Sequence, residues 1–153
     1  MPTTLDVFSR TREFDRWAYG KDHVDGAEAM MLERFLDPNL SVLEGGTGAG
    51  RLVRFLKARG FRTLAGFDFV PALIDVCRQR DVNGEIDFRV LEATRLDFAD
   101  GEFDQAVYLQ NILCGVDGDA ARRQALRELR RVPKPGGVAL ISLLGFEHRT
   151  RSL

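Results

Sequence analysis

The stretch VLEGGTGAG at residues 42–50 decides the fold of this protein. Two apolar residues and an acid precede four glycines that fall within six positions. Because glycine in a regular element costs roughly 0.5–1 kcal/mol, a tight turn would use only one or two. Four glycines favour a loop whose bare backbone lies against a ligand. The N–H groups of a helix that follows such a loop point at that ligand.

Strands and helices alternate on both sides of the glycine loop. Short apolar runs predict strands at residues 40–44, 63–69, 87–91, 103–109 and 138–144. Apolar residues at helical spacing predict helices at residues 26–36, 52–59 and 119–132, and one that begins at Pro71. This alternation predicts an α/β fold, with a doubly wound, mainly parallel sheet of about five strands and helices on both faces.

The last predicted strand has two expected features. Residues 133–137, which read PKPGG, predict a turn before it. Residues 138–144 are apolar at nearly every position, so we expect this strand to be buried on both faces.

The composition is that of one ordinary globular domain. The chain has 153 residues, of which 44% are hydrophobic and 29% charged. We expect a helical arm or cap at residues 1–36 and an α/β core at residues 37–153. The formal net charge of -1 attracts neither nucleic acid nor an anionic membrane, and the apolar runs are too short to span a bilayer. Cys77 and Cys114 lack a metal-binding spacing, which predicts no metal site and a cytoplasmic protein.

The residues around the loop favour a cationic ligand over a dinucleotide. The dinucleotide fingerprint needs a third glycine at position 51, where the chain has Arg51. Glu44 directly precedes the loop, and a carboxylate is a poor neighbour for a pyrophosphate but a good one for an amino group. The pattern therefore favours S-adenosylmethionine over a nicotinamide cofactor, and a nicotinamide-dependent oxidoreductase is the less favoured alternative.

Residues 40–144 resemble the class I S-adenosylmethionine-dependent methyltransferases of the small-molecule type. Their first motif corresponds to EGGTGAG at residues 44–50. Further motifs follow in the family's order, namely FDF at 67–69, LEA at 91–93, RLDFADGEFD at 95–104 and RVPKPGG at 131–137. The ordered set is much more specific than the glycine motif alone.

The resemblance implies how the loop would meet the cofactor. The backbone of Gly46 and Gly48 would approach the methionine part, and Glu44 would help to hold its amino group. The other residues expected in the cofactor site near the loop and the fourth strand are Gly45, Thr47, Gly50 and Gln110.

The resemblance also implies a site for the adenosine part. Asp68 would bind both ribose hydroxyls, and Phe69 would lie against the adenine. Glu92 would reach the adenine amino group, and the backbone N–H of Ala93 would reach a ring nitrogen. Helix capping by Asp68 and a solvated position for Glu92 are the structural alternatives.

No catalytic residue is identified from the sequence. Methyl transfer from a sulfonium is an in-line displacement, and it needs a general base only when the acceptor must lose a proton. His23, His148 and Cys114 are candidates for such a base, and ordinary surface or core roles explain each of them better. Trp17 and Tyr19 resemble an arm that covers the cofactor in some relatives, and simple packing on the core explains them equally well.

The resemblance ends before the family's usual last strands, because the chain ends at Leu153. Three explanations are open: a fragment, pairing with a second copy along the exposed edge of the fifth strand, or a reduced protein without turnover. We expect a methyltransferase that acts on a small molecule and leaves S-adenosylhomocysteine. The alternative from another class is a non-catalytic cofactor-binding or dimer-forming module.

Overall fold

The computed structural model describes residues 11–20 and 22–143. Its centre is one five-stranded sheet in the order β3-β2-β1-β4-β5, and all neighbouring strands are parallel. The strands are β1 (Val42–Gly45), β2 (Leu64–Asp68), β3 (Ile86–Val90), β4 (Phe103–Tyr108) and β5 (Pro133–Ile141). The strand order reverses between β1 and β4, and this is where open α/β sheets bind ligands, beyond the carboxyl ends of the strands.

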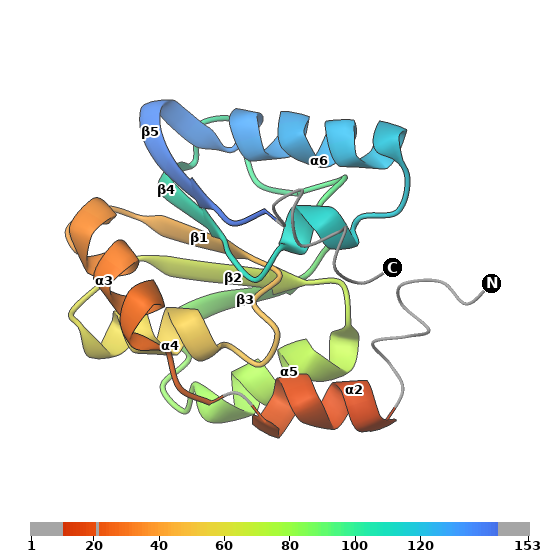
Figure 1. The fold of residues 1–153 in the computed structure, drawn as a ribbon. Coiled ribbons are helices and arrows are strands. Elements are labelled where there is room, and N and C mark those ends of the chain that lie inside the picture. The colour runs from red at the N-terminus through yellow and green to blue at the C-terminus, as the bar shows by residue number, and fades with distance from the viewer. Residues whose placement is uncertain (1–10, 21, 144–153) are drawn as a thin grey trace.

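Helices cover both faces of the sheet (Figure 1). The longer helices are α3 (Gly26–Phe35), α4 (Arg51–Ala58), α5 (Pro71–Arg80) and α6 (Asp119–Arg131). Three short elements complete the described part of the chain: helix α2 (Thr11–Asp15), a π-helical turn η1 (Arg16–Gly20) and a 3-10 turn η2 (Ile112–Gly115). Helix α2 packs beside α5, and η2 follows β4 directly (Figure 1).

The two faces of the sheet carry separate apolar cores. Successive residues of a strand point to opposite faces, so Val42 of β1 joins the core under α3, α4 and α5, whereas Leu43 joins the core under α6. A third, smaller cluster includes Ala18 of η1, Ala49 of the glycine loop and Leu73 of α5. This cluster packs the N-terminal arm beside the loop.

The expected fold class is confirmed, and most elements lie within a few residues of their expected bounds. The wrong expectations concern β5. This strand begins at Pro133, so residues 133–137 belong to it and do not form a separate turn. Its register against β4 shifts between Phe103 and Gln105, where extra residues are accommodated and Gly136 takes a φ of 82°. A bulge of this kind bends the strand, as Figure 1 shows.

Strand β5 is also largely exposed, contrary to the expectation that it is buried on both faces. Val138 and Ile141 are each 39% exposed. The reason is the strand order, because β5 lies at the edge of the sheet and no described element pairs with its outer side. None of the described helices is long and apolar enough to cross a membrane.

Candidate functional site

A pocket of about 380 Å³ opens at the carboxyl ends of the strands, next to the glycine loop. Its walls come from the loop, the ends of β2 and β4, the segment after β3, η2 and the N-terminal arm. The pocket brings together eight residues expected in the site: Trp17, Gly46, Gly48, Asp68, Phe69, Glu92, Ala93 and Gln110. A second hollow, lined by Thr63, Leu64 and Ile86 among others, lies at the amino ends of β2 and β3, away from the switch point.

Five expected residues do not line the pocket: Tyr19, Glu44, Gly45, Thr47 and Gly50. Glu44 is buried beneath the loop, where its carboxylate accepts hydrogen bonds from the Thr47 hydroxyl at 2.6 Å and the Val53 backbone N–H at 3.3 Å. Burial raises the pKa of Glu44 to about 8, although the bond from Thr47 opposes the shift. Glu44 therefore ties the glycine loop to the first turn of α4.

The loop glycines serve different purposes. A Cβ on Gly45 would lie 2.6 Å from the ring of Tyr108, and a Cβ on Gly46 would overlap the side chain of Ile112. These two glycines thus make room for protein side chains. A Cβ on Gly48 would have no heavy atom within 4 Å, and Gly48 lines the pocket with a φ of 56°. Gly48 is the position where a ligand can lie against bare backbone.

Asp68 joins three parts of the site. It ends β2 and is 6% exposed. One carboxylate oxygen accepts from the Gly48 backbone N–H and the other from the Val70 backbone N–H, both at 3.0 Å. Burial raises the pKa of Asp68 above its usual value. The Phe69 backbone N–H also bonds this carboxylate. Because a carboxylate has about four lone-pair sites, Asp68 can hold the loop and still accept a hydrogen bond from a ligand hydroxyl. The Asp68 side chain makes no cap at α5, whose N-cap residue is Val70.

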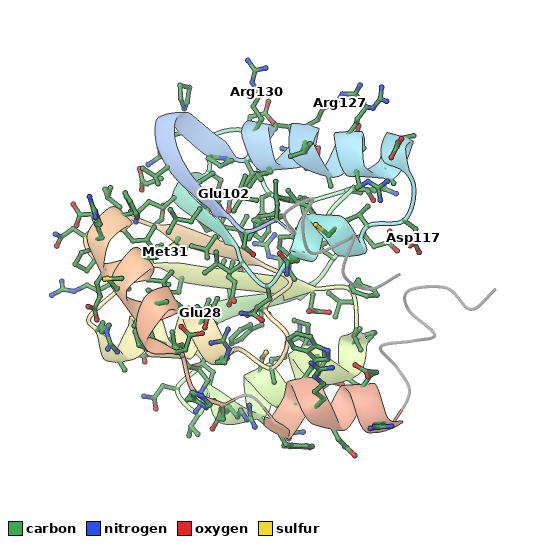
Figure 2. The ribbon with its side chains drawn as sticks, viewed as in Figure 1. Glu28, Met31, Glu102, Asp117, Arg127 and Arg130 are labelled. Atoms are coloured by element: carbon green, nitrogen blue, oxygen red, sulfur yellow. The ribbon has the colours of Figure 1, made fainter. Side chains whose placement is uncertain are left out.

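The charge around the pocket has one sign. The acidic side chains of Asp68, Glu92 and Asp117 line it, and no lysine, arginine or histidine of the described residues does. Asp117, labelled in Figure 2, follows η2 on the side away from the loop. The remaining wall is mainly apolar, with Phe67 and Leu91 among its members. Such a pocket favours a ligand with an apolar body and a positive charge.

The sequence did not point to Glu28, the side chain that ties the end of β4 to the start of α4. Gln110 and Asn111 both have a φ of 60°, a left-handed backbone that side chains rarely adopt. The side-chain amide of Gln110 donates to Glu28 of α3, which also binds Arg51, the first residue of α4. Figure 2 labels Glu28. Nothing local in the sequence marks these residues as partners, because they are distant along the chain.

The N-terminal arm contributes one of its two expected aromatic residues to the pocket. Trp17 lines the pocket, whereas Tyr19 is 61% exposed and packs edge-on against Phe14. Arg80 of α5 donates to the backbone oxygen of Ala18 at 2.8 Å and of Ala49 at 3.3 Å. Arg80 thereby fastens the arm to the glycine loop.

The candidate bases lie elsewhere. His23 is exposed and Cys114 is half-buried, and neither lines the pocket. Burial strongly raises the pKa of the Cys77 thiol, whose sulfur donates to the Gly48 carbonyl at 3.2 Å. His148 lies outside the described residues. Within the described ranges, no cluster of three metal-ligating side chains is present either.

Comparisons with known proteins agree with this geometry. Residues 43–141 match a family model described as a methyltransferase domain. The chain is 30% identical over 110 residues to a ubiquinone/menaquinone biosynthesis C-methyltransferase of Geotalea daltonii, a match that covers 68% of this chain and 45% of that protein. It is 31% identical to a malonyl-[acyl-carrier protein] O-methyltransferase of Serratia marcescens, covering 86% of this chain and 51% of that protein. The chain thus spans about half the length of these relatives.

A solved structure shares the fold. It is the Haemonchus contortus phosphoethanolamine N-methyltransferase 2 in complex with phosphomonomethylethanolamine and S-adenosylhomocysteine. The TM-score is 0.75 at 18% identity, and the match covers 99% of this chain and 39% of that one. At this identity the likeness extends to the fold alone.

Proposed function

Because this chain belongs to the methyltransferase-domain family, we propose that it transfers a methyl group from S-adenosylmethionine to a small-molecule acceptor. The observation that carries the proposal is the pocket beside Gly48, which three carboxylates line and no described basic side chain does. A positively charged sulfonium and ammonium suit these charges, whereas a pyrophosphate would be repelled. This favours the methyl donor over a nicotinamide cofactor.

The residues present fit the cofactor. Gly48 offers the open backbone that a Cβ would fill, and Asp68 offers two acceptor oxygens for the ribose hydroxyls. Phe69, Glu92 and Ala93 line the same pocket, where we propose that they hold the adenine. When bound, the cofactor supplies an electrophilic methyl group on a sulfonium.

Glu44 supports the site from beneath. Its hydrogen bonds to Thr47 and Val53 fix the loop, and a negative charge on it would favour the amino group of the cofactor. We therefore assign Glu44 to loop geometry first, and second to an electrostatic effect on the amino group from beneath the loop, because Glu44 does not line the pocket.

Positioning accounts for the proposed catalysis. Holding nucleophile, methyl carbon and sulfur in line supplies much of the rate enhancement in such a displacement. Trp17 covers one side of the pocket and limits the entry of water. With no described histidine, cysteine, lysine or tyrosine on its walls, we propose an acceptor whose nucleophile needs no strong base, or one deprotonated by Asp117. One relative is named for ubiquinone/menaquinone biosynthesis and another for malonyl-[acyl-carrier protein], and the proposed organic acceptor is consistent with both names.

Titration calorimetry tests the cofactor. The chain is titrated with S-adenosylhomocysteine and with NAD, and the Asp68→Ala variant is titrated alongside. We expect saturable binding of S-adenosylhomocysteine, weak or no binding of NAD, and loss of S-adenosylhomocysteine binding in the variant. A folded chain that prefers NAD, or that binds neither, contradicts the proposal.

Several features outside the pocket remain proposals. We propose that residues 1–36 act as a cap on the core at residues 37–153, and that the protein is cytoplasmic, consistent with the free thiols of Cys77 and Cys114. We also propose that a second copy pairs with the open edge of β5. Sedimentation should then show a dimer that Ile141→Lys dissociates, and a monomer at all concentrations contradicts the pairing.

A further inference from the structure

One carboxylate outside the matched family region contacts a residue of the pocket lining, Gln110, and the residue that directly follows the glycine-loop wall, Arg51. Glu28 lies in the first turn of α3, upstream of residues 43–141. It accepts from both terminal nitrogens of Arg51, at 2.6 Å and 3.0 Å, and from the side-chain amide of Gln110. Arg51 is the first residue of α4 after the glycine loop, and Gln110 follows the end of β4.

The contact between Glu28 and Arg51 is more than a surface ion pair. The two side chains are only 13% and 11% exposed, and both carboxylate oxygens face the guanidinium fork. Bidentate pairs of this kind fix orientation as well as distance. The pairing with Arg51 lowers the pKa of Glu28, so the carboxylate remains charged in the neutral range. Arg51 also donates to the His23 backbone oxygen at 3.0 Å, which joins the residues before α3 to the same centre.

The wall at the end of β4 needs such support. Gln110 and Asn111 both adopt left-handed backbone conformations, which cost free energy and persist only when their surroundings hold them. The Asn111 backbone N–H donates to the Ser142 hydroxyl at 2.9 Å. On the other side, the Gln110 side chain is held by Glu28. Without this carboxylate, the tandem left-handed turn loses the hydrogen bond that ties the Gln110 side chain to α3.

We propose that Glu28 is a positioning residue that sets the separation between the glycine loop and the end of β4, and so makes α3 part of the cofactor site. This inference rests on the proposed function, because one of its tests measures the affinity for S-adenosylhomocysteine. It does not require Glu28, which is absent from the lining of the pocket, to touch the cofactor. Removing the charge should let both walls relax and weaken binding without unfolding the sheet.

The chain supplies a matched control on the same helix. Glu33 of α3 also pairs with an arginine, Arg59, at 2.6 Å, but the two side chains are 54% and 40% exposed and Glu33 does not touch the pocket. Glu28→Gln and Glu33→Gln therefore remove the same charge from the same element. The two variants differ in whether the replaced carboxylate contacts Arg51 and Gln110.

Two measurements on the 153-residue chain test the proposal. The first is calorimetric affinity for S-adenosylhomocysteine, well below the melting temperature. Glu28→Gln should raise the Kd at least tenfold, and Glu33→Gln should change it less than twofold. The second is hydrogen exchange without ligand. In Glu28→Gln the amides of Gly48 and Asn111 should exchange faster together, with the core of the sheet unchanged.

The outcomes are distinct. Unchanged affinity in Glu28→Gln, or exchange that rises uniformly over the whole sheet, overturns the positioning role. If the wild-type chain binds no S-adenosylhomocysteine, the proposed function fails, and the exchange pattern alone decides the role of Glu28. Should Glu28→Gln not fold, Arg51→Lys is measured instead. It keeps the charge but loses the fork, and it should show the same local exchange pattern to a smaller degree.

Discussion

Replacing Gly48 by alanine, and Gly60 by alanine as a control, distinguishes the loss of ligand contact from the cost of backbone strain. Gly48 has a φ of 56°, and a Cβ added there meets no heavy atom within 4 Å. Gly60, which follows α4, also has a positive φ, of 89°, and equally open surroundings, but it does not line the pocket. Each substitution forces a side chain into a left-handed backbone, which costs roughly 1–2 kcal/mol.

The two variants should therefore lose similar stability. For a chain of this size, 1 kcal/mol shifts the melting temperature by about 2–4 °C, so both should melt several degrees below the wild type. Only the methyl group at Gly48 would occupy the pocket. We expect Gly48→Ala to bind S-adenosylhomocysteine at least tenfold more weakly than the wild type, because the ligand loses its close approach to the loop. Gly60→Ala should bind within twofold of the wild type.

Thermal denaturation and titration calorimetry on both variants check this. Equal cofactor affinity in Gly48→Ala and Gly60→Ala would refute the assignment of Gly48 to ligand contact. A Gly48→Ala protein that melts far below Gly60→Ala would show that the loop has a packing constraint beyond its backbone conformation.

Two further predictions concern stability. Burial raises the pKa of Glu44 from 4.5 to about 8, so between these values the folded state keeps a proton that the unfolded chain releases. The free energy of unfolding should therefore fall as the pH rises from about 5 to 8, by up to roughly 1.4 kcal/mol per pH unit. Denaturation measured at several pH values should show a smaller dependence of stability on pH in Glu44→Gln. The dependence that remains is due to Asp68, whose pKa is also raised. An unchanged dependence would contradict the assignment to Glu44. Arg131 donates to two backbone oxygens in segment 96–98, at 3.0 Å and 2.7 Å, so Arg131→Met should cost about 1–3 kcal/mol. The control is Arg127→Met on the same helix, because Arg127 (Figure 2) makes only an exposed side-chain hydrogen bond, to Gln124; equal stability of the two variants would rule out the contribution of Arg131.

The fold class and part of the site are predictable from local patterns. Apolar runs and helical spacing depend on which residues of a single element are buried. They therefore locate strands such as Leu64–Asp68 within a residue or two. The order of the motifs then places Asp68 and Glu92 at the ends of neighbouring parallel strands. Their meeting in one pocket follows from the geometry of a parallel sheet, and both residues line the pocket.

The exposure of β5 was not predictable in this way. Its residues are apolar, and apolarity alone indicates that a strand prefers burial. Whether a strand is buried depends on what lies beside it, and that is set by strand order and by the elements available to cover the edge. In the described part of the chain β5 is the edge strand, so Val138 and Ile141 remain partly exposed.

The sequence by itself determined the alternation of strands and helices, the glycine loop and the acids that follow two strands, because each depends on residues that are neighbours along the chain. The tertiary structure alone decided which loop glycines face protein and which faces open space. It also decided that Glu28 meets Arg51 and Gln110, which lie 23 and 82 positions away. Such contacts depend on how separate elements pack, and that packing leaves no periodic signal in the sequence.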